Sequence, residues 1–358
     1  MLTGRRIGQN PTGSLLSFQR RKELYAICSK YDVLIIEDDP YFCLQFPSVP
    51  NLEAAVRGIP LPGQPEAHTL PKKSGFPFLD SLVPSYLQLD TDGRVIRLDT
   101  FSKTIAPGCR LGWITAQPAI IERILRITEA STAQPSGFVQ TMVAELLIGD
   151  QPAKAEFARK SRAEQKEFTG WKVDGWVRWI EGLRGSYERR MTRMCNILED
   201  GRFQLKQGTP LRPSESDWAV ISKTEMYAFD WPRGGMFVWL RMRFDTHPLA
   251  SQVPGPKISD AFWIYLTQKP NLVLAAPGQL FSPTPEIAAK EAWKHLRLCF
   301  AAVDEKDVEL CSERFSRAVA TFWAIKNKKE LEDINGDGEA LQMGQGVEMF
   351  NLGLAMGC

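Results

Sequence analysis

The sequence predicts an α/β fold in which a domain with a mainly parallel sheet is followed by a small C-terminal α+β domain. Residues 14–31 have the apolar spacing of a helix, and the short apolar run at residues 33–36 is typical of a strand buried on both faces. Two further apolar runs, at residues 95–98 and 111–116, indicate neighbouring strands. From about residue 227 short strands and turns predominate, which indicates the second domain.

The other elements follow in chain order. Residues 47–84 are rich in Pro and Gly and predict a long surface excursion. A long helix is predicted around residues 176–200, and its arginines alternate with glutamates as on a solvated face. Apolar runs at residues 232–240, 272–275 and 296–300 predict strands of the second domain.

These elements set the expected domain limits. Residues 1–185 form the large domain, residues 186–325 the small domain, and residues 326–358, which are polar and Gly-rich, a disordered tail. With 358 residues, 44% of them apolar and 24% charged, the chain is ordinary for a globular protein and long enough for two domains.

The composition argues against several classes of protein. A net charge of +2, from 44 basic and 42 acidic residues, does not suit a nucleic-acid-binding face. No apolar run reaches the roughly 18–20 residues of a membrane span. Seven cysteines without close pairs indicate reduced thiols, and with no secretory signal we expect a cytoplasmic protein. His68, His247 and His295 are too scattered to predict a metal site.

The segment around Lys103 is the most informative for chemistry. Lys103 follows a predicted buried strand, and a lysine there becomes a Schiff-base nucleophile if burial or nearby cations lower its pKa. Thr100 and Ser102 supply hydroxyls and Arg110 a forked guanidinium, which are the groups that a phosphate needs. Taken alone, the segment is weak evidence, and a surface lysine after a strand is the default interpretation.

Three other segments carry candidate residues. Asp38 ends a strand and Tyr41 follows three residues later, a pair that suits a protonated ring nitrogen and a ring hydroxyl. Taken alone, the segment is better explained as a strand-to-turn junction capped by Asp and Pro. Asn10 lies in an Asn-Pro-Thr-Gly turn. Arg297 lies in an apolar strand, where its burial is costly unless it meets an anion, either a ligand or a structural carboxylate.

Together these segments resemble the class I/II pyridoxal-phosphate aminotransferases of fold type I. The likeness is strongest to fungal aromatic-amino-acid and 2-aminoadipate aminotransferases, relatives of kynurenine aminotransferase. The resemblance extends from about Gly8 to about Trp323, and several long motifs in one order make it specific. The motifs are residues 8–13 (GQNPTG), 35–41 (IIEDDPY), 97–103 (RLDTFSK), 108–113 (GCRLGW), 179–185 (WIEGLRG), 234–237 (GGMF) and 277–278 (PG).

The resemblance implies how the cofactor, pyridoxal 5′-phosphate, is held. Lys103 would bind it as an internal aldimine and then move the proton in the reaction. Asp38 would pair with the pyridinium nitrogen, and Asn10 and Tyr41 would hydrogen-bond the 3-oxygen of the ring. The phosphate-binding residues would be Thr100, Ser102 and Arg110.

The resemblance also implies the reaction, a ping-pong transamination between an aromatic amino acid, kynurenine or 2-aminoadipate and a 2-oxo acid. Arg297, with Asn10, would bind the substrate α-carboxylate. The family implies a homodimer. Its members carry a long segment before the Asn-Pro-Thr-Gly loop, so we expect the sequence to be N-terminally truncated.

Two alternatives remain open from the sequence. One is a different fold-type-I reaction, such as β-elimination or decarboxylation. The other is a catalytically impaired remnant that acts only as the partner of a full-length homologue.

Overall fold

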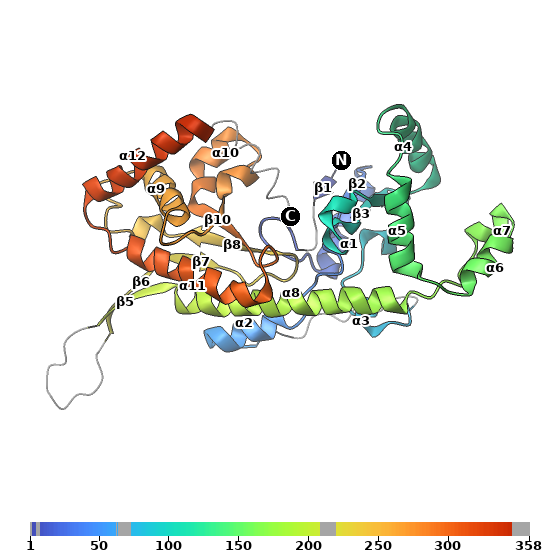
Figure 1. The fold of residues 1–358 in the computed structure, drawn as a ribbon, viewed down its shortest axis with the longest axis horizontal. Helices are drawn as coiled ribbons and strands as arrows, with labels where there is room; N and C mark the ends of the chain where they lie inside the picture. The colour runs from blue at the N-terminus through green and yellow to red at the C-terminus, as the bar shows by residue number, and fades with distance from the viewer. Residues whose placement is uncertain (1, 5–7, 62, 64–72, 208–219, 346–358) are drawn as a thin grey trace. The chain divides into compact units, whose positions relative to one another are not determined.

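The structure is a computed structural model of the 358-residue chain, and it describes residues 2–4, 8–61, 63, 73–207 and 220–345 (Figure 1). The chain divides into two compact units. Unit 1 comprises Met1–Gln9, Ser14–Phe46 and Gly63–Ser186, and unit 2 comprises Asn10–Gly13, Pro47–Pro62 and Tyr187–Cys358. The division falls inside helix α8, Asp174–Asp200, next to the expected domain limit at residue 185. Two short segments expected in the large domain, Asn10–Gly13 and Pro47–Pro62, are grouped with unit 2.

The described part of unit 1 is built on a sheet with the strand order β1-β2-β3-β4. The strands are β1 Leu2–Gly4, β2 Ile35–Asp38, β3 Val95–Thr100 and β4 Gly112–Thr115. The first three are parallel, and β4 pairs with β3 in the antiparallel direction. The three strands predicted early in the chain are thus neighbours, and the prediction of a mainly parallel sheet is confirmed.

Helix α1, Phe18–Lys30, covers one face of this sheet. Its first turn is capped by Ser17, whose Oγ accepts the N–H of Arg20 at 3.2 Å. The core beneath the helix consists of Tyr25, Cys28, Ile35, Tyr86 and Val95. Ile35 and Val95 are in register, and side chains alternate between the two faces of a sheet. Glu37 and Arg97, two residues further along these strands, therefore lie on the same face, under α1.

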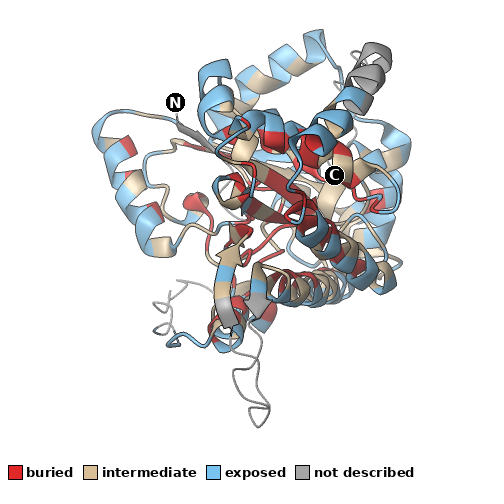
Figure 2. Ribbon diagram, turned by 90° about the vertical axis from the view of Figure 1, so that its left-hand side faces the viewer, coloured by how far each residue is buried: buried red, intermediate tan, exposed pale blue. Residues whose placement is uncertain are grey.

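The remaining elements of unit 1 are helical. They are α3 Pro77–Asp80, α4 Pro118–Ala130, α5 Gly137–Ile148, α6 Ala153–Arg159 and α7 Arg162–Lys166, with the 3-10 turns η1 Tyr86–Gln88, η2 Phe101–Lys103 and η3 Pro107–Cys109. In unit 1 buried residues lie in β2, β3 and α1 (Figure 2), whereas β4 and α4 contain none. On helix α5, Phe138, Met142 and Leu146 form a stripe that is 75%, 51% and 62% exposed. Within the described residues, no helix combines the length and the apolar composition that a membrane crossing requires.

Unit 2 contains an antiparallel sheet in the order β7-β8-β10-β9. Its strands are β7 Tyr227–Phe229, β8 Phe237–Met242, β9 Ala276–Pro277 and β10 His295–Cys299, while β5 Phe203–Gln207 pairs separately with β6 Val220–Glu225. The helical elements are α2 Val49–Arg57, α9 Gly255–Thr267, α10 Pro285–Lys290, α11 Glu305–Phe322, α12 Lys328–Gln345, η4 Phe244–Thr246, η5 Gly278–Phe281 and η6 Ala292–Lys294.

Three sequence expectations differ from the structure. The expected tail at residues 326–358 contains helix α12, because fully buried Leu331 packs this segment against α9 and offsets the cost of its glycines. Residues 272–275 are not a strand, since Leu272 adopts a left-handed conformation with φ 50°. The expected excursion at residues 47–84 contains α2 and α3, and part of it, with residues 346–358 of the tail, lies outside the described residues.

Candidate active site

Asp38 and Lys103 lie at the same edge of the unit 1 sheet. Asp38 is the last residue of β2 and is in register with Leu98 of β3. β3 ends at Thr100, and the turn η2 that follows directly ends at Lys103. Because β2 and β3 are parallel, their carboxyl ends reach one edge, which is where α/β sheets bind ligands. Both Asp38 and Lys103 are half-buried.

The predicted phosphate-binding residues lie in adjoining turns of unit 1. The Thr100 hydroxyl donates to Ser102 Oγ at 2.9 Å, and the same Thr100 oxygen accepts the N–H of Ser102 at 3.1 Å. Turn η3 packs against η2 and ends at Arg110, which is exposed and has a left-handed φ of 45°. Arg110 donates only a long 3.5 Å hydrogen bond to the carbonyl of Pro107, and no described carboxylate pairs with it. Two hydroxyls and an exposed guanidinium are a suitable donor set for an anion.

Tyr41 lies in the turn that follows β2, and its side chain is only 1% exposed. The Tyr41 carbonyl accepts the N–H of Leu44 at 2.8 Å, which closes the turn. Phe42, the next residue, lies against the guanidinium of Arg97, with 4.4 Å between the guanidinium carbon and the ring centroid. Asp38 and Tyr41 thus belong to one short segment that is anchored to β3.

Asn10 and Arg297 meet within unit 2. Arg297 Nη1 donates to Asn10 Oδ1 at 2.8 Å, and Arg297 is 4% exposed in strand β10. The loop of Asn10 is fixed at Gly13, whose carbonyl accepts the N–H of Arg233 at 2.8 Å. Gly13 has a φ of +66°, and a Cβ there would lie 2.4 Å from Pro232 Cβ, so only glycine fits. Of the eight predicted site residues, these two lie in unit 2 and the other six in unit 1.

Sequence reasoning missed a cluster of charged side chains in unit 1. Its members are Arg21 of α1, Glu37 and Asp39 around the end of β2, and Arg97 and Asp99 of β3. Side chains alternate along a strand, so Glu37 projects from the opposite face to Asp38, under helix α1. The sequence shows charged residues at alternate positions, Glu37 and Asp39 around one strand end and Arg97 and Asp99 in the next strand, but their contact depends on the register of the two strands.

Arg97 and Glu37 are the centre of this cluster. Arg97 donates to both oxygens of Asp99 at 2.8 Å and to Glu37 Oε2 at 3.3 Å. Glu37 also accepts from Arg21 Nη1 at 2.9 Å and from the hydroxyl of Ser85. These contacts bind β2, β3 and α1 to one another close to Asp38 at the end of β2 and to the end of β3, which leads into the turn of Lys103.

Asp39 is the one member of this cluster whose carboxyl oxygens are both buried without a hydrogen-bond partner among the described residues. Its nearest cation is Arg97, with 3.8 Å between Oδ2 and Nη1. Burial, with the charge of Glu37, raises the pKa of Asp39 to about 8 against the attraction of Arg21 and Arg97. This pKa favours the protonated form of Asp39 at neutral pH, in which Glu37 and Asp99 balance the two guanidinium groups.

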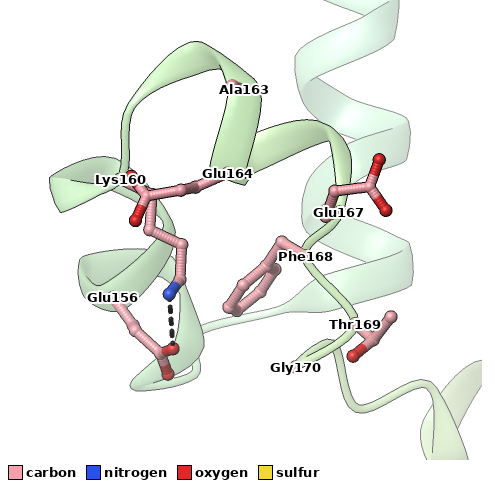
Figure 3. Close-up of a pocket in the computed structure, with 8 residues that line it drawn as sticks. All are labelled: Glu156, Lys160, Ala163, Glu164, Glu167, Phe168, Thr169 and Gly170. Atoms are coloured by element: carbon pink, nitrogen blue, oxygen red, sulfur yellow. Dashed lines mark ion pairs between the residues drawn. The ribbon is translucent and has the colours of Figure 1, made fainter.

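A pocket of about 620 Å³ lies elsewhere in unit 1, around Phe168. Its lining residues are Glu156, Lys160, Ala163, Glu164, Glu167, Phe168, Thr169 and Gly170 (Figure 3). Lys160 pairs with Glu156 at 3.3 Å. The pocket is separate from the predicted site, because none of the predicted site residues lines it.

Comparison with known proteins identifies the family. The family model described as aminotransferase class I and II matches residues 8–169. An L-tyrosine:2-oxoglutarate aminotransferase of Tapinella panuoides is 34% identical over 274 residues, which cover 76% of this chain and 41% of that protein. An aromatic amino acid aminotransferase of Schizosaccharomyces pombe is 32% identical over 330 residues, or 90% of this chain and 55% of that protein.

Solved structures agree with this result. The crystal structure of aminotransferase Aro8 from Candida albicans has a TM-score of 0.62 and 29% sequence identity, over 90% of this chain and 58% of that one. Residues 8–169 thus match the class I and II aminotransferases, and the predicted resemblance and α/β fold are confirmed. It spans about half the length of the curated relatives it matches.

Proposed function

We propose that this chain contributes the reactive lysine of a pyridoxal-phosphate-dependent aminotransferase that moves an amino group from an aromatic amino acid to a 2-oxo acid. The observation that carries the proposal is the position of Lys103 and Asp38 at one edge of the sheet. Hydroxyls and an exposed arginine lie in the adjoining turns. This arrangement falls within the residues matched by the family model.

The residues of unit 1 fit pyridoxal phosphate in their chemistry. Arg110 is suited to a phosphate dianion, because no described carboxylate neutralises it and its fork can contact two oxygens. Thr100 and Ser102 add hydroxyl donors in the adjacent turn. Asp38 would bind the ring nitrogen and Tyr41 the ring oxygen, and both belong to the segment that Arg97 anchors to β3.

The cofactor supplies an electron sink for the carbanion that forms at the substrate α-carbon. Lys103 would hold the cofactor through its Nζ, and the same Nζ would take the proton from the substrate α-carbon. Asp38 would hold a proton on the ring nitrogen by its negative charge. Arg297, positioned by Asn10, would bind the substrate α-carboxylate through its guanidinium.

The substrate class rests on the relatives. The proteins named above are a tyrosine and an aromatic amino acid aminotransferase, which supports tyrosine, phenylalanine or tryptophan as donor. A bovine relative, 34% identical, is a kynurenine/alpha-aminoadipate aminotransferase, which extends the range to kynurenine and 2-aminoadipate. The name of the Tapinella protein supports 2-oxoglutarate as the acceptor.

Two further points belong to this proposal. A homodimer is supported by the exposed apolar stripe of Phe138, Met142 and Leu146 on α5, because such a stripe is costly in water and suits an interface. A cytoplasmic location is supported by the cysteines, since the six cysteines in the described residues are free thiols.

The test is to map the lysine that binds the cofactor. The purified chain is incubated with pyridoxal phosphate, reduced with borohydride, and digested for mass spectrometry. We expect the label on Lys103, its loss in Lys103→Ala, and its retention in Lys306→Ala, which removes an exposed lysine. Transfer from tyrosine to 2-oxoglutarate by wild type but not by Lys103→Ala supports the reaction. Labelling spread over surface lysines, or unchanged turnover in Lys103→Ala, would contradict the proposal.

A further inference from the structure

Two aromatic rings contact the guanidinium of Arg297 inside unit 2. The guanidinium carbon lies 4.0 Å from the ring centroid of Phe237 and 4.7 Å from that of Phe281. Phe237 belongs to β8, the neighbour of β10, and is fully buried. Phe281 ends the turn η5 and is half-buried. One ring is therefore part of the core, whereas the other reaches Arg297 from a surface turn.

The local sequence places Phe281 by a close backbone approach. Gly278 begins η5, and a Cβ at this residue would lie 2.1 Å from the carbonyl oxygen of Ala292. No other residue allows η5 to lie so close to the turn that leads into β10. The ring of Phe281 then meets Trp239 edge-on, at 5.5 Å and 88°. Trp239 is the residue of β8 directly opposite Arg297, so this contact fixes the ring beside the guanidinium.

These contacts restrict the orientation of the Arg297 guanidinium. A guanidinium is planar, and aromatic rings attract it electrostatically through their π-faces. Asn10 adds a hydrogen bond at 2.8 Å to Nη1. A guanidinium held in one orientation loses less conformational entropy when a carboxylate binds, and this increases its affinity for the carboxylate.

We propose that Phe281 is a positioning residue, whose ring holds the guanidinium of Arg297 in the orientation that receives the carboxylate of the substrate. The inference rests on the proposed function of Arg297 as the carboxylate-binding residue. Phe281 acts through Arg297 and takes no part in the reaction itself. Removal of the ring lowers the affinity for 2-oxo acids and leaves the affinity for pyridoxal phosphate unchanged.

The experiment compares ring-deleting and ring-keeping variants. The dissociation constant of 2-oxoglutarate is measured by ligand-observed NMR on wild type, Phe281→Leu, Phe281→Met and Phe281→Tyr. We expect it to rise about three- to tenfold in the Leu and Met variants and to stay within about twofold in the Tyr variant. The dissociation constant of pyridoxal phosphate, followed by absorbance, should stay unchanged in all three.

A matched control removes another ring that contacts a cation. Phe203 lies 3.8 Å from Lys223 Nζ, also in unit 2, and Phe203→Leu should leave both constants unchanged. Equal 2-oxoglutarate affinity in Phe281→Leu, Phe281→Met and wild type overturns the inference, as does unfolding of both variants, since Phe281 is then a core residue. If Arg297→Met also retains the affinity, the proposed role of Arg297 fails as well, so the two failures are distinguishable.

Discussion

Two buried arginines, one in each unit, are held in different ways. Arg97 of unit 1 lies among carboxyl groups, with Asp99, Glu37 and Asp39 within 4 Å. The contacts that hold Arg297 of unit 2 include an amide oxygen and two aromatic rings, groups that carry no net charge. We propose that the charge of Arg97 stabilises the fold, whereas that of Arg297 serves a ligand. The following variants test this contrast.

The largest expected effect is on the stability of unit 1. Arg97→Met should lower the free energy of unfolding by about 3–5 kcal/mol, because Asp99 and Glu37 lose a guanidinium that they contact in the buried cluster. Urea denaturation at pH 7 measures this loss. The control is Arg126→Met, which removes a 75% exposed arginine of α4 and should change stability by less than about 0.5 kcal/mol. Similar losses in both variants would mean that Arg97 is not structural.

The next effect concerns the proton on Asp39. In the unfolded chain this carboxyl ionises near pH 4, whereas its pKa in the folded protein is about 8. Its contribution to stability is therefore complete below about pH 4 and is lost as the pH rises to about 8, with a slope of at most about 1.4 kcal/mol per pH unit. Asp39→Asn should remove this slope and stabilise the protein by about 1–3 kcal/mol at pH 8.

Urea denaturation at several pH values between 5 and 9 checks this prediction. The control is Asp38→Asn, which alters the neighbouring, half-buried carboxyl. The pH dependence of stability that comes from Asp39 should remain in this variant. A loss of stability in Asp39→Asn at pH 8 would show that Asp39 is ionised in the folded protein.

A smaller effect, on the affinity for 2-oxoglutarate, should follow when a carboxylate is placed beside Arg297, as carboxyl groups lie beside Arg97. Asn10→Asp places a carboxylate where the amide oxygen now lies, 2.8 Å from Arg297 Nη1. This carboxylate competes with the substrate, so the dissociation constant of 2-oxoglutarate should rise about tenfold. Asn51→Asp, an exposed change on α2, is the control for added negative charge. Equal affinities in the two variants would argue against Arg297 as the carboxylate-binding residue.

The smallest expected effect is on the stability of unit 2. Arg297→Met keeps the length of the side chain and its packing against Phe237 and Phe281, so we expect less than half of the loss seen in Arg97→Met. Urea denaturation under the same conditions makes the two losses comparable. An equal or larger loss in Arg297→Met would remove the contrast between the two arginines.

The sequence predicted the parts of the site that depend on local motifs. Asp38 and Lys103 lie at or just after the ends of strands that short apolar runs identify, and parallel pairing then brings these strand ends to one edge. The contact between Asn10 and Arg297, which are 287 residues apart, confirms only that these two residues meet. The roles of the site residues stay predictions.

The sequence did not predict features that depend on register or tertiary packing. The Arg97 cluster needs Glu37 and Arg97 to be in register under α1, which no single segment indicates. Helix α12 forms because Leu331 is buried, against the low helix propensity of its glycines. Phe281 reaches Arg297 only because Gly278 lets η5 approach the turn before β10.

The most direct test of the contrast is the affinity of Arg297→Met for 2-oxoglutarate, measured by ligand-observed NMR beside wild type. A charge-assisted contact to a carboxylate is worth about 1.5–3 kcal/mol. We therefore expect the dissociation constant to rise about 10- to 100-fold while the variant remains folded. An unchanged dissociation constant in a folded variant would contradict the assignment of Arg297 to ligand binding.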